Sequence, residues 1–139
     1  MNLQRVLVIQ KRAIRTLKGL RPLDTCRSAF KELGILTVVG LYIQETILYA
    51  IKTDQTRTGD RHSHNTRHGR NFLLDHHHLS LTEKKPSYRG ALFFNILPDS
   101  LRRLPEKNFK APLKKLASTA SHLYHPRVPA VEDLSLAYQ

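Results

Sequence analysis

The chain has 139 residues, of which 40% are hydrophobic, so it can build one modest core but not two independent ones. Lysine and arginine number 23 against 11 acidic residues, and this net charge of +12 favours a polyanionic partner, either nucleic acid or an anionic membrane. Cys26 is the sole cysteine, which excludes an internal disulfide and the zinc modules built from two or more cysteines.

Residues 1–52 are predicted to be helical, and the first element is an amphipathic helix over 3–18. No acidic residue precedes Asp24, so the basic side of this helix is uncompensated within the helix itself. Gly19 and Pro22 are expected to end it. The apolar side comprises Leu3, Val6, Leu7, Ala13, Ile14 and Leu17, and the basic side comprises Arg5, Lys11, Arg12, Arg15 and Lys18.

A short second helix is expected to follow. Asp24 or Thr25 can accept hydrogen bonds from its first free backbone N–H groups. Phe30 and Leu33 are expected to be buried, and Gly34 is expected to end the helix.

The segment 38–52 is the predicted central core helix, and Thr37 can begin it. The apolar tract to which it belongs is interrupted at Gly40 and carries Gln44 and Glu45 at its centre, whereas a membrane-spanning helix needs about 20 mostly apolar residues. We therefore predict a buried helix and no membrane partner. Its apolar side chains are Leu41, Ile43, Ile47, Leu48 and Ile51.

Residues 53–86 are predicted to form a long basic loop rich in histidine and arginine. Hydrophobic residues vanish between 53 and 70, so nothing in that stretch could offset the entropy of ordering a packed structure. A loop of this length inside a compact domain is usually functional or disordered. The segments 72–74 and 79–81 could form short extended segments.

Residues 87–125 are predicted to be helical again. A helix over 88–97 is apolar on one side and is broken by Pro98. A short turn of helix over 99–104 is delimited by Pro105.

The last helix contains Pro112, which removes a backbone hydrogen bond and clashes with the preceding turn at a cost of about 3 kcal/mol. The helix is therefore expected either to start near Ala111 or to be kinked there. Residues 126–139 are expected to be a flexible tail. The apolar stripe of this helix is Phe109, Leu113, Leu116, Ala120 and Leu123, with Lys107, Lys110 and Lys114 opposite. The whole pattern predicts one small, mainly α-helical domain with a long basic loop.

The first residues show no signal-peptide pattern, because basic residues continue directly through the apolar positions of the first helix. A single cysteine fits a reducing compartment. We therefore expect an intracellular protein of the nucleus or cytoplasm that is not secreted.

Eight histidines raise the possibility of a metal site, above all His62, His64 and the run 76–78 next to Asp75. None of them has the spaced ligand pattern of a zinc helix, so loop histidines that bind metal only adventitiously are the favoured interpretation. His62 and His64 sit among arginines, where phosphate contact is the better role. No metal or other cofactor is expected.

Catalytic patterns are also missing. The carboxylates are scattered, whereas two-metal polymerase or nuclease chemistry requires them to gather around Mg²⁺, and a pairing through the fold stays open. No glycine-rich phosphate loop exists, and Cys26 has no identifiable partner base. The chain is not expected to be an enzyme.

Three basic clusters are the strongest local signal, because arginine binds phosphate oxygens bidentately and a loop can order along a nucleic-acid backbone. The alternative is three solvated patches that face different directions. The third cluster is Arg102, Arg103, Lys107, Lys110, Lys114 and Lys115. The expected nucleic-acid contacts come from the first two clusters: Lys11, Arg12, Arg15, Lys18, Arg57, Arg61, Arg67 and Arg70.

An ordered series of short motifs covers the chain from Leu3 to at least Leu116. They include Thr25-Cys26-Arg27, Leu33-Gly34-Ile35-Leu36-Thr37, Leu41-Tyr42-Ile43, His64-Asn65-Thr66-Arg67, Tyr88-Arg89-Gly90, Phe94-Asn95, Leu97-Pro98, Leu104-Pro105 and Phe109-Lys110. In this order and spacing, the motifs resemble the C-terminal region of the reverse transcriptase, an RNA-directed DNA polymerase, of jockey-like non-LTR retrotransposons.

The resemblance implies a region next to the polymerase thumb that holds template RNA or target DNA against the upstream polymerase domain. The family's catalytic aspartates and its endonuclease have no counterpart here, so no catalytic residue is carried over. We expect a non-catalytic fragment that binds the RNA or DNA backbone without strong sequence preference. The alternative is a decayed structural remnant or protein-interaction module, in which Leu3, Val6, Leu7 and Ile14 would form an exposed patch.

Overall fold

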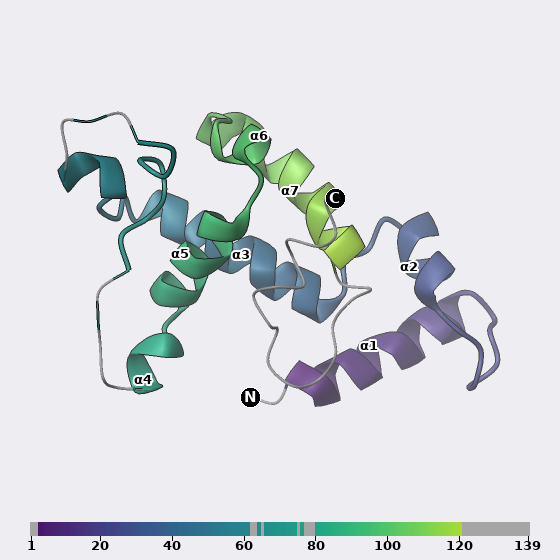
Figure 1. Cartoon of the computed structure of the whole chain (residues 1–139). Coiled ribbons are helices and arrows are strands. Elements are labelled where there is room, and N and C mark those ends of the chain that lie inside the picture. Colours follow the sequence, from purple (N-terminus) through teal and green to yellow (C-terminus); the bar gives the residue numbers. More distant parts are fainter. Residues whose placement is uncertain (1–2, 62–63, 65, 75, 77–79, 121–139) are drawn as a thin grey trace.

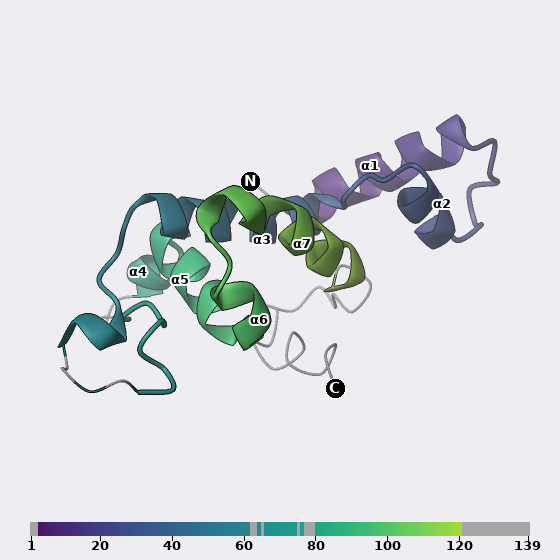
Figure 2. The same ribbon diagram turned by 90° about the horizontal axis from the view of Figure 1, so that it is seen from above.

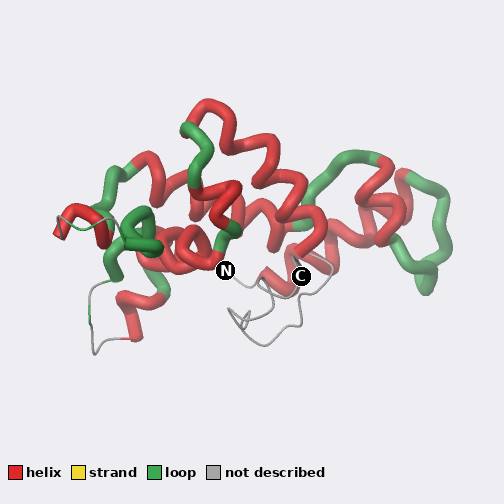
Figure 3. The backbone as a smooth tube through the Cα atoms, turned by 45° about the horizontal axis from the view of Figure 1, so that its top comes forward, coloured by secondary structure: helices red, strands yellow, loops and turns green. Residues whose placement is uncertain are grey.

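The predicted mainly α-helical fold is confirmed. The computed structural model describes residues 3–61, 64, 66–74, 76 and 80–120. Seven α-helices and one short 3-10 turn make up the secondary structure of these residues, and this part of the chain contains no β-strand (Figure 3).

A central helix, α3 (Val38–Lys52), runs through the middle of the molecule, with α5 (Pro86–Ile96) and α7 (Glu106–Ala120) packed against it (Figure 1). The first two helices, α1 (Leu3–Leu17) and α2 (Arg27–Glu32), lie toward one end of α3. The polypeptide that leaves the opposite end of α3 forms the long loop, as two views at right angles show (Figures 1 and 2).

Two clusters of buried side chains hold these helices together. A small cluster joins α1 to α2 and consists of Ile14, Cys26, Ala29 and Phe30. The main cluster joins α1, α3, α5 and α7 and consists of Leu7, Val39, Ile43, Ile47, Ala50, Phe72, Ala91, Phe93, Phe94, Leu97, Leu101, Phe109, Leu113 and Leu116.

Only part of the predicted apolar side of α1 is buried. Leu7 packs in the main cluster and Ile14 in the small one, whereas Ala13 is exposed and Leu17 is 72% exposed. Because α1 lies at one end of the molecule, its main contacts within the described part of the chain are with α2 and α3, and its other side chains stay largely exposed there. The helix ends close to the predicted point, and Gly19 adopts a left-handed φ of 62°.

The prediction that Asp24 or Thr25 caps the N-terminus of α2 is wrong. Cys26 occupies the cap position, and neither Asp24 nor Thr25 does. The Asp24 carboxylate accepts instead from a backbone N–H three residues earlier, within its own turn. Leu33 was expected to be buried but is 39% exposed, because the chain leaves the helix there and turns through Gly34 at a φ of 61°.

The bounds predicted for α3 are confirmed at both ends. The hydroxyl of Thr37 caps the helix by accepting from the backbone N–H three residues later at 3.2 Å. Of the predicted apolar side chains, only Leu41 is exposed. The approach of α5 is very close at Gly90, where an added Cβ would lie 1.9 Å from the carbonyl oxygen of Thr46.

Two side-chain amides tie distant segments together by bonding both backbone groups of a neighbouring stretch. The Nε2 atom of Gln10 donates to the carbonyl of Leu36 at 2.9 Å, and its Oε1 atom accepts from the N–H of Val38 at 2.8 Å. The Nδ2 atom of Asn95 donates to the carbonyl of Phe72 at 2.9 Å, and its Oδ1 atom accepts from the N–H of the same residue at 2.8 Å. The second amide fixes the long loop to α5.

The long loop is present, and its described residues are ordered although the stretch 53–70 supplies no apolar core of its own. It folds back on itself around a 3-10 turn, Thr58–Arg61, and Arg57 pairs with Phe72 in an isolated antiparallel bridge. Backbone hydrogen bonds of 2.8 Å flank this bridge on both sides. Residues 72–74 therefore contribute a single paired residue and not a strand.

The extended segment predicted at 79–81 is also wrong, because Ser80–Glu83 form a short helix, α4; Leu79 lies outside the described residues. Leu81 is 75% exposed, so its side chain would gain no burial from an extended conformation here. Helix α5 begins two residues earlier than predicted, because Pro86 suits the first turn of a helix.

The short helix α6 (Asp99–Arg102) confirms the predicted turn, and α7 runs from Glu106 with Pro112 inside it. The predicted alternative of a start near Ala111 is therefore wrong. Residues 121–139, including Leu123 and the predicted tail, lie outside the described residues. None of the described helices is both long enough and apolar enough to cross a membrane.

Candidate nucleic-acid interface

Of the four predicted contacts on α1 and directly after it, only some are free to bind a ligand. Arg12 is exposed, and Lys11 is partly buried. The Nε atom of Arg15 donates to the backbone carbonyl of Asp24 at 2.9 Å, and the ammonium of Lys18 lies 2.7 Å from the Glu32 carboxylate. Arg15 and Lys18 therefore attach α1 to the turn before α2 and to α2 itself. The basic side of α1 has no acid of its own, but α2 supplies one.

In the long loop, Arg57 has a structural role that the sequence did not predict. Its guanidinium lies 4.5 Å from the centre of the Phe72 ring and 5.3 Å from that of Phe94, and it donates to the carbonyl of Arg70 at 2.6 Å. A guanidinium stacked on aromatic rings stabilises the pair by about 1 kcal/mol when partly desolvated. Arg57 thus closes the base of the loop.

The other predicted loop contacts point to solvent. Arg61, Arg67 and Arg70 are exposed, and none of their side chains forms an ion pair or hydrogen bond with another described residue. They are carried on a folded-back loop whose base is fixed by Arg57 and Asn95. Phosphate groups could therefore reach them without displacing a partner among the described residues.

The α1 contacts and the loop contacts do not form one continuous surface. They lie toward opposite ends of α3, and the views of Figures 1 and 2 agree on this. With 15 residues, α3 spans about 22 Å at a rise of 1.5 Å per residue. A ligand that contacts both groups must be long enough to cross this distance.

The third basic cluster lies on α6 and α7. Arg102 is engaged by Asp99 and by the side-chain oxygen of Asn71, and Arg103 is exposed. The α7 lysines lie on the solvent side opposite the buried stripe, as predicted: Lys107, Lys110 and Lys114 are all exposed.

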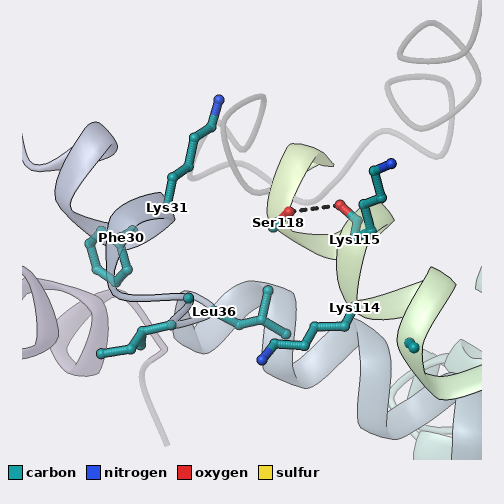
Figure 4. A pocket seen from close by; sticks show the side chains of 9 residues that line it. Phe30, Lys31, Leu36, Lys114, Lys115 and Ser118 are labelled. Atoms are coloured by element: carbon teal, nitrogen blue, oxygen red, sulfur yellow. Dashed lines mark hydrogen bonds between the residues drawn. The ribbon is translucent and has the colours of Figure 1, made fainter.

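A groove between α2 and α7, with a volume of about 360 Å³, brings together cations from two elements. Lys31 extends from α2, while Lys114 and Lys115 extend from α7, and Lys114 reaches toward the α2 side (Figure 4). The Ser118 hydroxyl donates to the Lys115 carbonyl at 2.7 Å along the α7 wall. The described residues that line this α2–α7 groove include no acid: Phe30, Lys31, Gly34, Ile35, Leu36, Ala111, Lys114, Lys115 and Ser118.

Sequence reasoning missed Lys31, which belongs to none of the three clusters predicted from local spacing. Only the fold brings Lys31 to the same groove as Lys114, and no local pattern in the sequence signals that arrangement.

The described residues contain no group of three or more histidine, cysteine or acidic side chains that could hold a metal ion. His62, His77, His78 and Asp75 lie outside the described residues. Cys26 is buried in the small cluster between α1 and α2.

No family model matches this chain. No curated protein and no solved structure matches it either.

Proposed function

We propose that this chain is a non-catalytic binder of the sugar-phosphate backbone of RNA or DNA. One observation supports this most: in the long loop, Arg61, Arg67 and Arg70 project into solvent, and no described acid pairs with them. Three guanidinium groups that have no partner among the described residues, carried on one loop, can each bind phosphate oxygens, and such contacts do not depend on base sequence. The exposed lysines of α7 and the exposed Arg12 of α1 add further positive charge elsewhere on the molecule.

The separation of the basic groups sets a length requirement on the ligand. The length of α3, about 22 Å, is a minimum for this separation, and it corresponds to roughly seven base-pair steps at 3.4 Å per step of duplex DNA. A shorter oligonucleotide can contact one end only. Affinity should therefore rise with length and level off once a strand reaches both ends of α3.

The test is a salt titration of full-length chain variants against labelled duplex DNA. Each phosphate contact contributes about 0.9 to the slope of log affinity against log salt. The double variant Arg67→Gln/Arg70→Gln should lower the magnitude of the slope by about 1.8. The control Arg27→Gln/Lys52→Gln removes the same charge from exposed positions outside the loop and should change the slope much less.

An equal change in both variants would mean that only net charge matters, and this would contradict a contact role for the loop.

The resemblance to a reverse transcriptase of jockey-like retrotransposons suggests a larger protein in which the chain would work. In that setting the chain is a region beyond the polymerase core, the upstream polymerase domain is a second partner, and the protein works inside the cell. Expression next to a polymerase core of that family, followed by co-purification, would test the second partner.

The second candidate function is a protein-interaction module, and the apolar surface of α1 favours it. The predicted exposed patch of Leu3, Val6, Leu7 and Ile14 does not form, because Leu7 and Ile14 are buried. Ile9 is 64% exposed, however, and Val8 beside it is also exposed. Self-association in size-exclusion chromatography that persists after nuclease treatment would favour this candidate.

A further inference from the structure

The α2–α7 groove has an apolar floor and a cationic rim. Phe30 and Leu36 are buried beneath it, and Ile35 is partly exposed to it. Lys31 and Lys114 bring positive charge from opposite walls (Figure 4). A surface of this kind suits a short segment that carries acidic side chains next to apolar ones.

The sequence of the chain contains such a segment. Residues 131–136 read Val-Glu-Asp-Leu-Ser-Leu, and Glu132 and Asp133 are the only adjacent pair of acidic residues in the sequence. We propose that this C-terminal segment binds in the α2–α7 groove of the same molecule, with its two carboxylates at the lysines and Leu134 on the apolar floor.

The point of attachment favours this occupant over a separate partner. Helix α7 ends at Ala120, two residues after Ser118, which lines the groove. The intervening residues 121–130 can span up to about 33 Å when extended, so reach imposes no restriction. A tethered segment has an effective concentration in the millimolar range, so even weak contacts of this type suffice to hold it.

The contact has a regulatory consequence that rests on the proposed function. Glu132 and Asp133 would compete with phosphates for Lys31 and Lys114. The segment would then act as an internal competitor of nucleic acid at this groove and leave the loop arginines free.

The direct test uses the full-length chain without nucleic acid. A carbodiimide forms an amide bond only between a carboxylate and an amine that touch, and mass spectrometry identifies the linked residues. Links from Glu132 and Asp133 should go mainly to Lys31 and Lys114, and their yield should be independent of protein concentration.

Lys107 and Lys110 serve as internal controls, because they are exposed on the same helix but do not line the groove. The variant Leu134→Asn keeps both acids and removes the apolar anchor, and it should spread the links over all α7 lysines. Links spread evenly in the unaltered chain, links unchanged by Leu134→Asn, or links that appear only at high protein concentration would each overturn the proposal.

A second measurement separates this inference from the proposed function. The variant Glu132→Gln/Asp133→Asn should bind RNA about threefold more tightly than the unaltered chain. Links in the groove combined with no RNA binding by either chain would support the groove contact and refute the proposed function.

Discussion

The close crossing of α3 and α5 leaves less room for a side chain at Gly90 than at any other glycine of the chain. A Cβ at this position would lie 1.9 Å from the carbonyl oxygen of Thr46 and 2.9 Å from the Cβ of Ala50. Ordinary contacts begin near 3.4 Å, and the oxygen belongs to the backbone of α3, so the helices themselves must move apart by more than 1 Å.

The cost of Gly90→Ala follows from that movement. Ile47, Ala91 and Phe93 are almost completely buried around the crossing, and their contacts weaken when the helices separate. Overpacking of a core costs about 1–3 kcal/mol and sometimes more, while alanine in a helix gains about 1 kcal/mol over glycine. Because the clash is with backbone, we expect a net loss of about 2–3 kcal/mol in the free energy of unfolding.

Urea unfolding followed by circular dichroism measures this loss. Gly34→Ala is the matched control: its Cβ would meet nothing within 4 Å, and its φ of 61° costs an alanine only about 1 kcal/mol. If Gly90→Ala is as stable as the unaltered chain, or loses less than Gly34→Ala, then α3 and α5 do not cross as described.

Three further substitutions test the amide contacts, the buried polar group and the base of the loop. Asn95→Asp replaces the N–H donor to the Phe72 carbonyl with a second oxygen and should cost about 2 kcal/mol of unfolding free energy, measured in urea; unchanged stability would contradict the amide contact. Gln44 is only 4% exposed and its Oε1 atom has no hydrogen-bond partner among the described residues, so Gln44→Met should stabilise the chain by about 1 kcal/mol, and a lower thermal midpoint would be the opposite result. Arg57→Gln removes the stacking on Phe72 and should speed proteolysis between residues 53 and 74, while the salt dependence of nucleic-acid binding stays nearly the same; a large fall in that salt dependence would identify Arg57 as a phosphate contact.

Helices α1, α2 and α3 could be predicted because their signals are local. The hydroxyl of Thr37 and the apolar period of 38–52 fixed both ends of α3, and Gly19 and Gly34 marked the ends of α1 and α2. These features depend on residues within one or two turns of each other.

The loop could not be predicted in the same way, because distant residues order it. Asn95 bonds the backbone of Phe72 from 23 positions away, and the Arg57 guanidinium stacks on Phe94 from α5. A composition without apolar residues between 53 and 70 indicates that the loop has no core of its own. It does not reveal that a neighbouring helix supplies one.

The candidate interface was predicted in its parts but not in its arrangement. The exposure of Arg61, Arg67 and Arg70 follows from their polar surroundings. Two features of the arrangement depend on the tertiary fold. The loop arginines and α1 lie toward opposite ends of α3, and Lys31 lines the same groove as two α7 lysines.

Binding to a phosphate backbone is the central claim, and the salt dependence of RNA affinity for the unaltered full-length chain tests it most directly. Fluorescence anisotropy with a labelled single strand of about 20 nucleotides gives the dissociation constant at each salt concentration. Three loop arginines alone predict a slope of at least about 2 in magnitude on a single strand, where each contact contributes about 0.7. A dissociation constant that stays the same from low to high salt, or no measurable binding at low salt, would contradict the claim.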